Sequence, residues 1–211
     1  RSPRVICGID KKAGGTWLGV NQFGLFAAVA NRLKTNLPAE PRSRGVLCRE
    51  LLNYETAAKA AEYCVRELNT EKYAGANYIC ADAKSAWVIH GGDIVERTEL
   101  PAGLHIISAN DVNDSSDERQ EFVRRLLTLQ RLDSAVAFLA VASRTFSRRA
   151  DAEGRRGVVV MGTEYGTVSS TLLALPKKTH NAVYHYSAGP PSESTYDDLS
   201  ALLRQVLSAE K

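Results

Sequence analysis

The sequence lacks the patterns that mark several specialised classes of protein. Its four cysteines are far apart and form no C-x-x-C pair, and its four histidines have no H-x-x-x-H or H-E-x-x-H spacing. We therefore expect neither a disulfide scaffold nor an intrinsic metal site. No apolar run approaches the ~18 residues of a membrane span, and no signal-type apolar region follows Arg1. These absences predict a protein of a reducing compartment without a membrane span.

The composition is that of an ordinary globular protein, with 44% hydrophobic and 24% charged residues. Twenty-seven Lys and Arg against 24 Asp and Glu leave a net charge of +3, too small an excess to indicate nucleic-acid binding without a basic face. Five arginines fall between residues 144 and 157 without helical periodicity. We predict an irregular, exposed connection there rather than a nucleic-acid patch.

Hydrophobic periodicity predicts an α+β protein. The near-continuous apolar run at 25–30 indicates a strand in the middle of a sheet, whereas Ala57, Cys64 and Leu68 share one face of a helix. Further strands are expected at 5–9, 16–20, 76–81, 86–90, 94–98, 104–108, 157–161, 167–175 and 182–186, and further helices after the caps at 115–118 and 133–134 and at 199–207. Consecutive hairpins with segregated helices favour mainly antiparallel sheets covered by helices. Without an internal repeat or linker, we expect one domain over residues 1–211.

Two Gly-containing segments carry polar or aromatic groups where binding sites commonly form. Residues 13–21 place two glycines before a strand that contains Trp17, and local physics favours a hairpin with a core tryptophan. Residues 165–171 put Tyr165, Thr167 and further hydroxyl groups at the mouth of a strand. Because side chains alternate along a strand, some of these hydroxyl groups lie on the same face of the sheet. That face is either one wall of a binding site or the solvated side of the sheet.

Two further segments carry polar residues at predicted strand ends. Residues 108–111, with Ser108 and Asn110, end a strand and fit an Asx turn. Asn31 and Arg32 follow the buried strand, where Arg32 either binds an anion or caps the sheet edge. No Ser-His-Asp or Cys-His arrangement can be assembled from these pieces.

Several blocks of the sequence resemble the NRDE family, also called the transport-and-Golgi-organisation family. The most specific are GGTWLGVN at 14–21 and GLFAAVANR at 24–32, and three more follow in the family's order at 43–45, 73–78 and 165–171. The resemblance covers most of the chain. It implies the fold of N-terminal nucleophile hydrolases, a four-layer αββα sandwich.

The chain departs from the family pattern at the residues tied to catalysis. The family's N-terminal cysteine nucleophile and Asn-Arg-Asp-Glu segment are not in the sequence, so we expect the chain to begin just downstream of them, without the family's N-terminal strand segment. Its catalytic residues are therefore unknown. Cys7 is no substitute, because such a nucleophile uses its own α-amine as base. Ala109 and Val168 stand where the resemblance implies an Asn and an Arg near an oxyanion, and losing one such donor costs roughly 10²–10³ in rate.

The resemblance implies a protein that binds or handles a small, partly apolar ligand, of the haem or acyl-coenzyme A trafficking type, in the cytoplasm and with little or no catalysis. No intrinsic cofactor is expected, so haem would be cargo. One cleft is predicted to hold the ligand, lined by Trp17, Asn31, Arg32, Ser108, Asn110, Tyr165 and Thr167. Two alternatives stay open. One is an N-terminal cysteine amidohydrolase or acylase for linear amides whose nucleophile segment is missing from this chain, and the other is an interaction module that uses the arginine-rich 144–156 loop.

Overall fold

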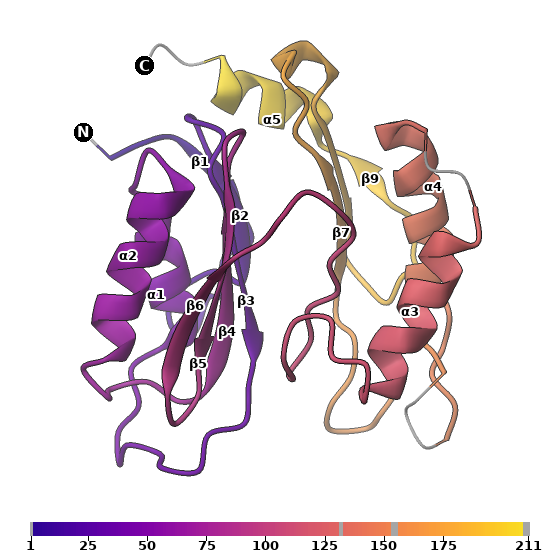
Figure 1. Cartoon of the computed structure of the whole chain (residues 1–211). Coiled ribbons are helices and arrows are strands. Elements are labelled where there is room, and N and C mark those ends of the chain that lie inside the picture. Colours follow the sequence, from indigo (N-terminus) through magenta and orange to yellow (C-terminus); the bar gives the residue numbers. More distant parts are fainter. Residues whose placement is uncertain (1, 131–132, 153–155, 209–211) are drawn as a thin grey trace. The chain divides into compact units, whose positions relative to one another are not determined.

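The computed structural model describes residues 2–130, 133–152 and 156–208. Within it the chain divides into two compact units (Figure 1). The first unit comprises the chain up to Val112 together with the residues from Gln205 onward, and the second runs from Asn113 to Arg204. Both combine antiparallel strands with helices, as the sequence predicts. The expectation of a single domain stays a prediction.

The first unit is built on a six-stranded antiparallel sheet whose strands follow each other in chain order. Two helices, joined by a short connection, pack on one face of this sheet (Figure 1). Its elements are β1 (Val5–Cys7), β2 (Leu18–Asn21), β3 (Phe26–Asn31), α1 (Arg44–Leu51), α2 (Ala57–Leu68), β4 (Ala76–Ala81), β5 (Ala86–Gly91) and β6 (Val95–Glu99). The predicted strand at 25–30 is therefore an interior strand, β3, paired with β2 and β4.

The core of the first unit lies between the sheet and the two helices. Ser43 and Thr56 cap the helices, each through a side-chain oxygen that accepts a backbone N–H three residues on. Cys64 and Leu68 are buried on the predicted stripe of α2. The strands add Tyr78, which is fully buried. Burial of such side chains at roughly 1.5–3 kcal/mol each makes this interface the main source of stability in the unit.

Trp17 does not belong to the core, contrary to the prediction. It precedes β2 by one residue, and 38% of its surface is exposed. Its carbonyl still accepts a hydrogen bond from Val29 N of β3 at 2.9 Å, so its backbone is paired while its ring turns away. The ring lies over Gly8, where an added Cβ would come within 2.9 Å of the indole Cε2. The absence of a side chain at Gly8 thus leaves room for the indole.

The second unit contains a smaller, three-stranded antiparallel sheet and its own helices. Its elements are α3 (Glu118–Thr128), α4 (Ala135–Phe146), β7 (Ser170–Ala174), a 3₁₀ turn (Thr179–Asn181), β8 (Val183–Ser187), β9 (Asp197–Asp198) and the first part of α5 (Ser200–Leu207), a helix whose residues from Gln205 onward are counted in the first unit. Asp117 and Ser134 cap α3 and α4, which confirms the predicted helix starts. The hairpin of β7 and β8 is also as predicted, whereas the two-residue β9 was not expected.

In the first unit the strand predicted at 5–9 ends at Cys7, and the one predicted at 16–20 runs from Leu18 to Asn21. Three strands predicted after residue 100 are absent or shorter because other groups take their backbone hydrogen bonds. Residues 104–108 form no strand, and the Ser108 carbonyl accepts from a side chain, Asn77 Nδ2. Residues 157–161 contribute only one bridge, between Val159 and Arg149. The strand expected at 167–175 starts at Ser170, because Thr167 is tied into a local turn.

The arginine-rich segment is an irregular connection that starts later than predicted. Helix α4 continues through Arg144 and ends at Phe146, with Ser147 as its C-cap. From Ser147 the chain is irregular apart from the Arg149–Val159 bridge, and the part at 153–155 lies outside the described residues. For the described residues the predicted irregular connection is confirmed, with its start moved by three residues. Arg148, Arg149 and Arg156 are exposed as predicted, whereas Gly157 is buried.

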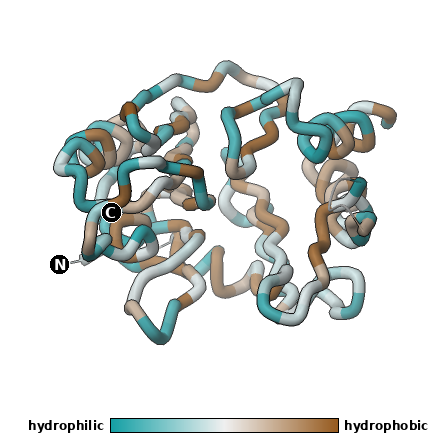
Figure 2. Tube along the Cα trace, turned by 90° about the horizontal axis from the view of Figure 1, so that it is seen from below, coloured by the Kyte–Doolittle hydropathy of each residue, from teal (hydrophilic) through white to brown (hydrophobic). Residues whose placement is uncertain are grey.

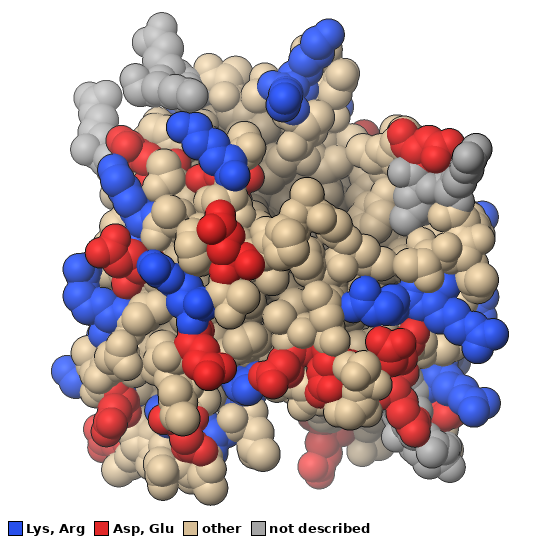
Figure 3. Space-filling model, in the orientation of Figure 1, with Lys and Arg blue, Asp and Glu red and all other residues tan. Residues whose placement is uncertain are grey.

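Polarity is mixed along the whole described trace. Hydrophobic and hydrophilic residues alternate over short stretches (Figure 2), and no helix among the described residues is long and apolar enough to cross a membrane. On the face shown in Figure 3, Lys and Arg side chains lie among Asp and Glu side chains rather than in a patch of one sign.

Candidate functional site

The candidate site of the first unit is centred on a buried asparagine in the middle of the six-stranded sheet. Asn77 lies on β4 opposite Ala30 of β3 and His90 of β5. Tyr78 and Ile89, the next positions along β4 and β5, belong to the core under α1 and α2. Because side chains alternate along a strand, Asn77 and His90 point to the other face of the sheet.

Both ends of the Asn77 side-chain amide are hydrogen-bonded, the NH₂ group to the segment after β6 and the oxygen to His90. Its Nδ2 donates to the carbonyls of Ser108 and Asn110, both at 2.8 Å. Since these two acceptors fix the amide orientation, Oδ1 must be the acceptor toward His90 Nδ1 at 2.7 Å. The proton of the His90 imidazole therefore sits on Nδ1 when the ring is neutral. Such a buried, satisfied polar group fixes one conformation of the loop.

Arg32 brings a cation to the same place. Its Nη2 lies 2.6 Å from Asp111 Oδ1, and its Nη1 lies 3.5 Å from Asn77 Oδ1. The Arg32 side chain is 21% exposed and that of Asp111 is 65% exposed, so the pair lies at the protein surface. Gly92 in the turn after β5 lies alongside, because a Cβ there would come 3.3 Å from Arg32 Nε. The guanidinium is held in place and still has access to solvent.

His90 is kept neutral by its surroundings. Burial lowers the pKa of His90, the positive charge of Arg32 lowers it further, and Asp111 and Glu96 oppose these effects. At neutral pH the ring is thus an uncharged donor to Asn77. The site then contains the Arg32–Asp111 ion pair, a saturated amide and a neutral imidazole. Because the proton of that imidazole is on Nδ1, the lone pair that can accept a proton is on Nε2. The guanidinium suits recognition of an anionic group.

The structure brings together three of the seven residues predicted to line one cleft. Arg32 joins the site directly, and Ser108 and Asn110 join through their carbonyls on Asn77. Asn31 pairs with Ala76 and so points to the helix side of the sheet. Trp17 lies against Gly8, beside β1.

The two remaining residues, Tyr165 and Thr167, belong to the second unit and are described within it. Thr167 accepts a hydrogen bond from Val160 N at its Oγ1 and donates its own N–H to Val160 O. Tyr165 is exposed in the same turn. Thr167 thus has a structural role that the strand prediction missed, while the shared cleft stays a prediction.

Sequence reasoning did not single out Asn77 and His90. A signal was present, since Asn77 is a polar residue in the otherwise apolar run Ala76–Ala81, and a buried polar side chain needs partners. His90 has the same character at the end of β5. The partners themselves lie more than 30 positions away for the Asn77 amide, which no local pattern can indicate.

The cysteines of the chain are free and unreactive. Cys48, Cys64 and Cys80 are buried in the core of the first unit, and Cys7 is partly buried. Burial raises the pKa of Cys7, and it raises that of Cys80 to about 12. Such thiols stay protonated at neutral pH and are poor nucleophiles. Among the described residues, no group of three or more His, Cys, Asp or Glu side chains is placed to hold a metal ion.

Comparison with known proteins gives three similarities. The family model described as Transport and Golgi organisation 2 matches residues 1–187. The human Transport and Golgi organization protein 2 homolog is 33% identical over 95 residues, which are 43% of this chain and 32% of the human protein. The match thus spans about a third of that relative. A solved structure of penicillin V acylase from Agrobacterium tumefaciens is similar with a TM-score of 0.46 and 13% identity, over 94% of this chain and 77% of that one.

Proposed function

Because the chain belongs to the transport-and-Golgi-organisation family, we propose that it binds a small, partly apolar molecule with an anionic group and does so with little or no catalysis. Haem and long-chain acyl-coenzyme A both have this chemistry, since each joins a large apolar part to carboxylate or phosphate groups. The ligand is cargo rather than a resident cofactor. The free thiols support a reducing compartment such as the cytoplasm.

The observation that carries this proposal is the held guanidinium of Arg32. Asp111 pairs with Arg32 at 2.6 Å on the exposed side, and Asn77 Oδ1 lies 3.5 Å from it on the buried side. An arginine oriented in this way loses little conformational entropy when it binds a carboxylate or phosphate. Alternation along β4 places Ile79, which is partly buried, on the same sheet face as Asn77, so this face has an apolar side chain as well as the cation.

The expectation of little catalysis is supported by the state of the candidate groups. The pKa of the Cys7 thiol is raised, so this group is not an activated nucleophile. His90 is neutral and can accept a proton at Nε2, but among the described residues no hydrogen bond joins it to a Ser, Thr or Cys side chain that it would activate. Palmitoyl-coenzyme A incubated with the protein should release coenzyme A no faster than in buffer.

The test is direct titration of the chain with haem, followed by absorbance, and with palmitoyl-coenzyme A, followed by calorimetry. We expect saturable binding of at least one ligand and about tenfold or greater weakening in Arg32→Ala, because a charge-assisted hydrogen bond is lost. Arg4→Ala is the matched control, since Arg4 is exposed just before β1 and its replacement removes the same charge. Absence of saturable binding to both ligands, or equal weakening in the two variants, would contradict the proposal.

A further inference from the structure

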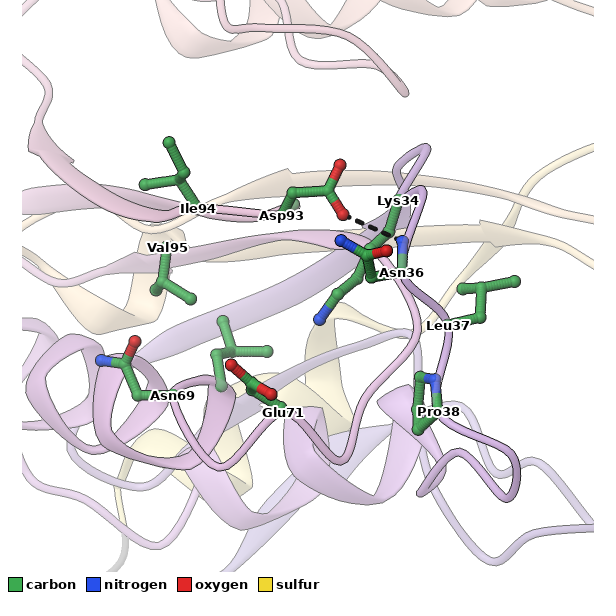
Figure 4. A pocket seen from close by; sticks show the side chains of 11 residues that line it. Lys34, Asn36, Leu37, Pro38, Asn69, Glu71, Asp93, Ile94 and Val95 are labelled. Carbon is green, nitrogen blue, oxygen red and sulfur yellow. Dashed lines mark hydrogen bonds between the residues drawn. The ribbon is translucent and has the colours of Figure 1, made fainter.

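A pocket of about 550 Å³ lies in the first unit at the turn between β5 and β6 (Figure 4). Its walls come from the loop after β3 (residues 34–38), the end of α2 and the turn residues 92–95. Its size is within the range of sites for small molecules. The pocket adjoins the site at Asn77 through Gly92, but Arg32, Asn77 and His90 are not among the residues that line it.

The loop that forms one wall is held in place by Asp93. The Asp93 carboxylate accepts hydrogen bonds from the backbone N–H groups of Thr35 and Asn36, both at 3.1 Å, and from the hydroxyl of Thr35. These bonds lower the pKa of Asp93, so its carboxylate stays ionised, and its oxygens are used by the hydrogen bonds to the loop. The wall is therefore preformed, and Asp93 serves the loop rather than a ligand.

Two opposite charges in the pocket do not pair with each other. In Figure 4 the Lys34 side chain extends into the space beside Asn36, and the Glu71 carboxylate extends into it from beyond the end of α2. Lys34 Nζ has a weak contact of 3.4 Å with the Tyr73 carbonyl. Among the described ion pairs none joins Lys34 to Glu71. Lys34 also lies close enough to Asp93 to lower its pKa, but the Asp93 oxygens already accept the N–H groups of the loop. The Lys34 ammonium and the Glu71 carboxylate, which are held apart in one pocket, match a ligand that carries both charges.

Glu71 occupies a backbone position that its residue type disfavours. Its φ is 58°, in the left-handed region, and its N–H donates to the Leu68 carbonyl at 3.1 Å just after α2 ends. Glycine or asparagine is the usual residue where a helix ends in this conformation. The backbone alone would thus favour a glycine over a glutamate at this position. A strained residue whose side chain points into a pocket indicates a use for that side chain.

Two apolar side chains line the pocket beside these charges. Leu68 is 3% exposed, and the side chain of Val95 points into the pocket (Figure 4), whereas those of Leu37 and Ile94 point away from it. The apolar wall of Leu68 and Val95 favours a ligand with an aliphatic part.

From these observations we infer that the pocket binds a zwitterion with an apolar side chain, of the size of an amino acid or dipeptide. The ligand carboxylate pairs with Lys34, its ammonium group pairs with Glu71, and its side chain packs against Leu68 and Val95. The inference does not rest on the proposed function, which concerns Arg32 and a different class of ligand.

The first experiment uses calorimetry with the full chain and four probes. Leucine and Leu-Leu carry both charges, N-acetylleucine lacks the ammonium group, and leucinamide lacks the carboxylate. We expect saturable binding of leucine or Leu-Leu and about tenfold or greater weakening for each of the other two probes. The tighter binder of leucine and Leu-Leu shows whether the pocket takes a free amino acid or a dipeptide. Equal binding of all four probes, or no binding of either zwitterion, overturns the inference.

The second experiment separates a binding role of Glu71 from a structural one. Glu71→Gly should raise the melting temperature by about 2 °C, because it relieves the left-handed strain, and should still weaken zwitterion binding about tenfold. Lys34→Met should weaken binding by a similar factor. Glu62→Gln and Lys84→Met remove the same charges at exposed positions outside the pocket and serve as controls. Undiminished binding in Glu71→Gly overturns the inference.

Discussion

The two units of the chain differ in how their irregular segments are held. In the first unit, buried amides bind the connections: Asn21 donates to the carbonyls of Leu52 and Tyr54, and Asn77 donates to those of Ser108 and Asn110. In the second unit, the connection between α4 and β7 is held by its own Arg149–Val159 bridge, by Arg119 of α3, which donates to the Val158 carbonyl, and by Thr167. We therefore expect the loops held by buried amides in the first unit to be the more rigid ones.

The largest expected effect that tests this contrast is at Gly15. A Cβ at Gly15 would come 2.5 Å from Val46 N, and Thr16 N donates to Gly45 O at 2.9 Å, so the start of α1 cannot move away. Gly15→Ala should cost about 3 kcal/mol or more of unfolding free energy by urea denaturation. Gly24→Ala is the control, because its φ of 81° adds strain but nothing lies within 4 Å, and about 1 kcal/mol is expected.

The second unit offers a matched glycine. A Cβ at Gly157 would also overlap backbone, that of Arg149, but both residues lie in the irregular connection. Gly157 is buried and its neighbours Val158 and Val159 are hydrogen-bonded to Arg148, so we expect Gly157→Ala to cost about 2 kcal/mol, less than Gly15→Ala because the overlap is with an irregular segment rather than with the start of a helix. A cost equal to that of Gly15→Ala would show that both units hold their loops with the same rigidity.

The next effect concerns the buried amide of the candidate site. Asn77→Ala removes the donor of two loop carbonyls and the acceptor of His90, and it should cost about 3 kcal/mol. Amide exchange in residues 105–111 should speed up more than in β4 itself. Asn21→Ala removes a comparable amide at the end of β2 and should leave exchange in 105–111 unchanged. Unchanged exchange there in Asn77→Ala would contradict the assigned role.

Elements that bury one face could be predicted from local sequence patterns, whereas contacts between distant residues could not. The strands of the first sheet and the stripe of α2 follow from periodicity, because each of these elements buries one face in its own neighbourhood. Residues 104–108 were also predicted as a strand, yet they form none, and the Asn77 side chain binds the Ser108 carbonyl instead of a neighbouring strand. Likewise Arg32 was predicted from its position after β3, but Asn77 and His90 become a site only through long-range partners.

A smaller effect in the second unit tests the turn that shortens β7. Thr167 Oγ1 accepts from Val160 N at 3.1 Å, so Thr167→Val, which keeps the shape and removes the acceptor, should cost about 1 kcal/mol. Thr167→Ser keeps the oxygen and should lie within about 0.5 kcal/mol of the parent chain by urea denaturation. Equal costs for the two variants would show that the methyl group matters and the hydrogen bond does not.

The smallest effect is a pH dependence that belongs to the first unit. Burial and Arg32 lower the pKa of His90 below its ordinary value of 6.5, so the unfolded chain takes up the proton first as the pH falls. The contribution to stability is therefore complete above pH 6.5 and is lost as the pH falls from there toward the lowered pKa. His90→Gln should flatten the dependence of unfolding free energy on pH between about 7 and 5, which lies above the range in which carboxylates titrate. His180→Gln, at an exposed histidine of the second unit, should keep the slope of the parent chain. A slope that is equally steep in both variants would place the pH sensitivity outside the Asn77 site.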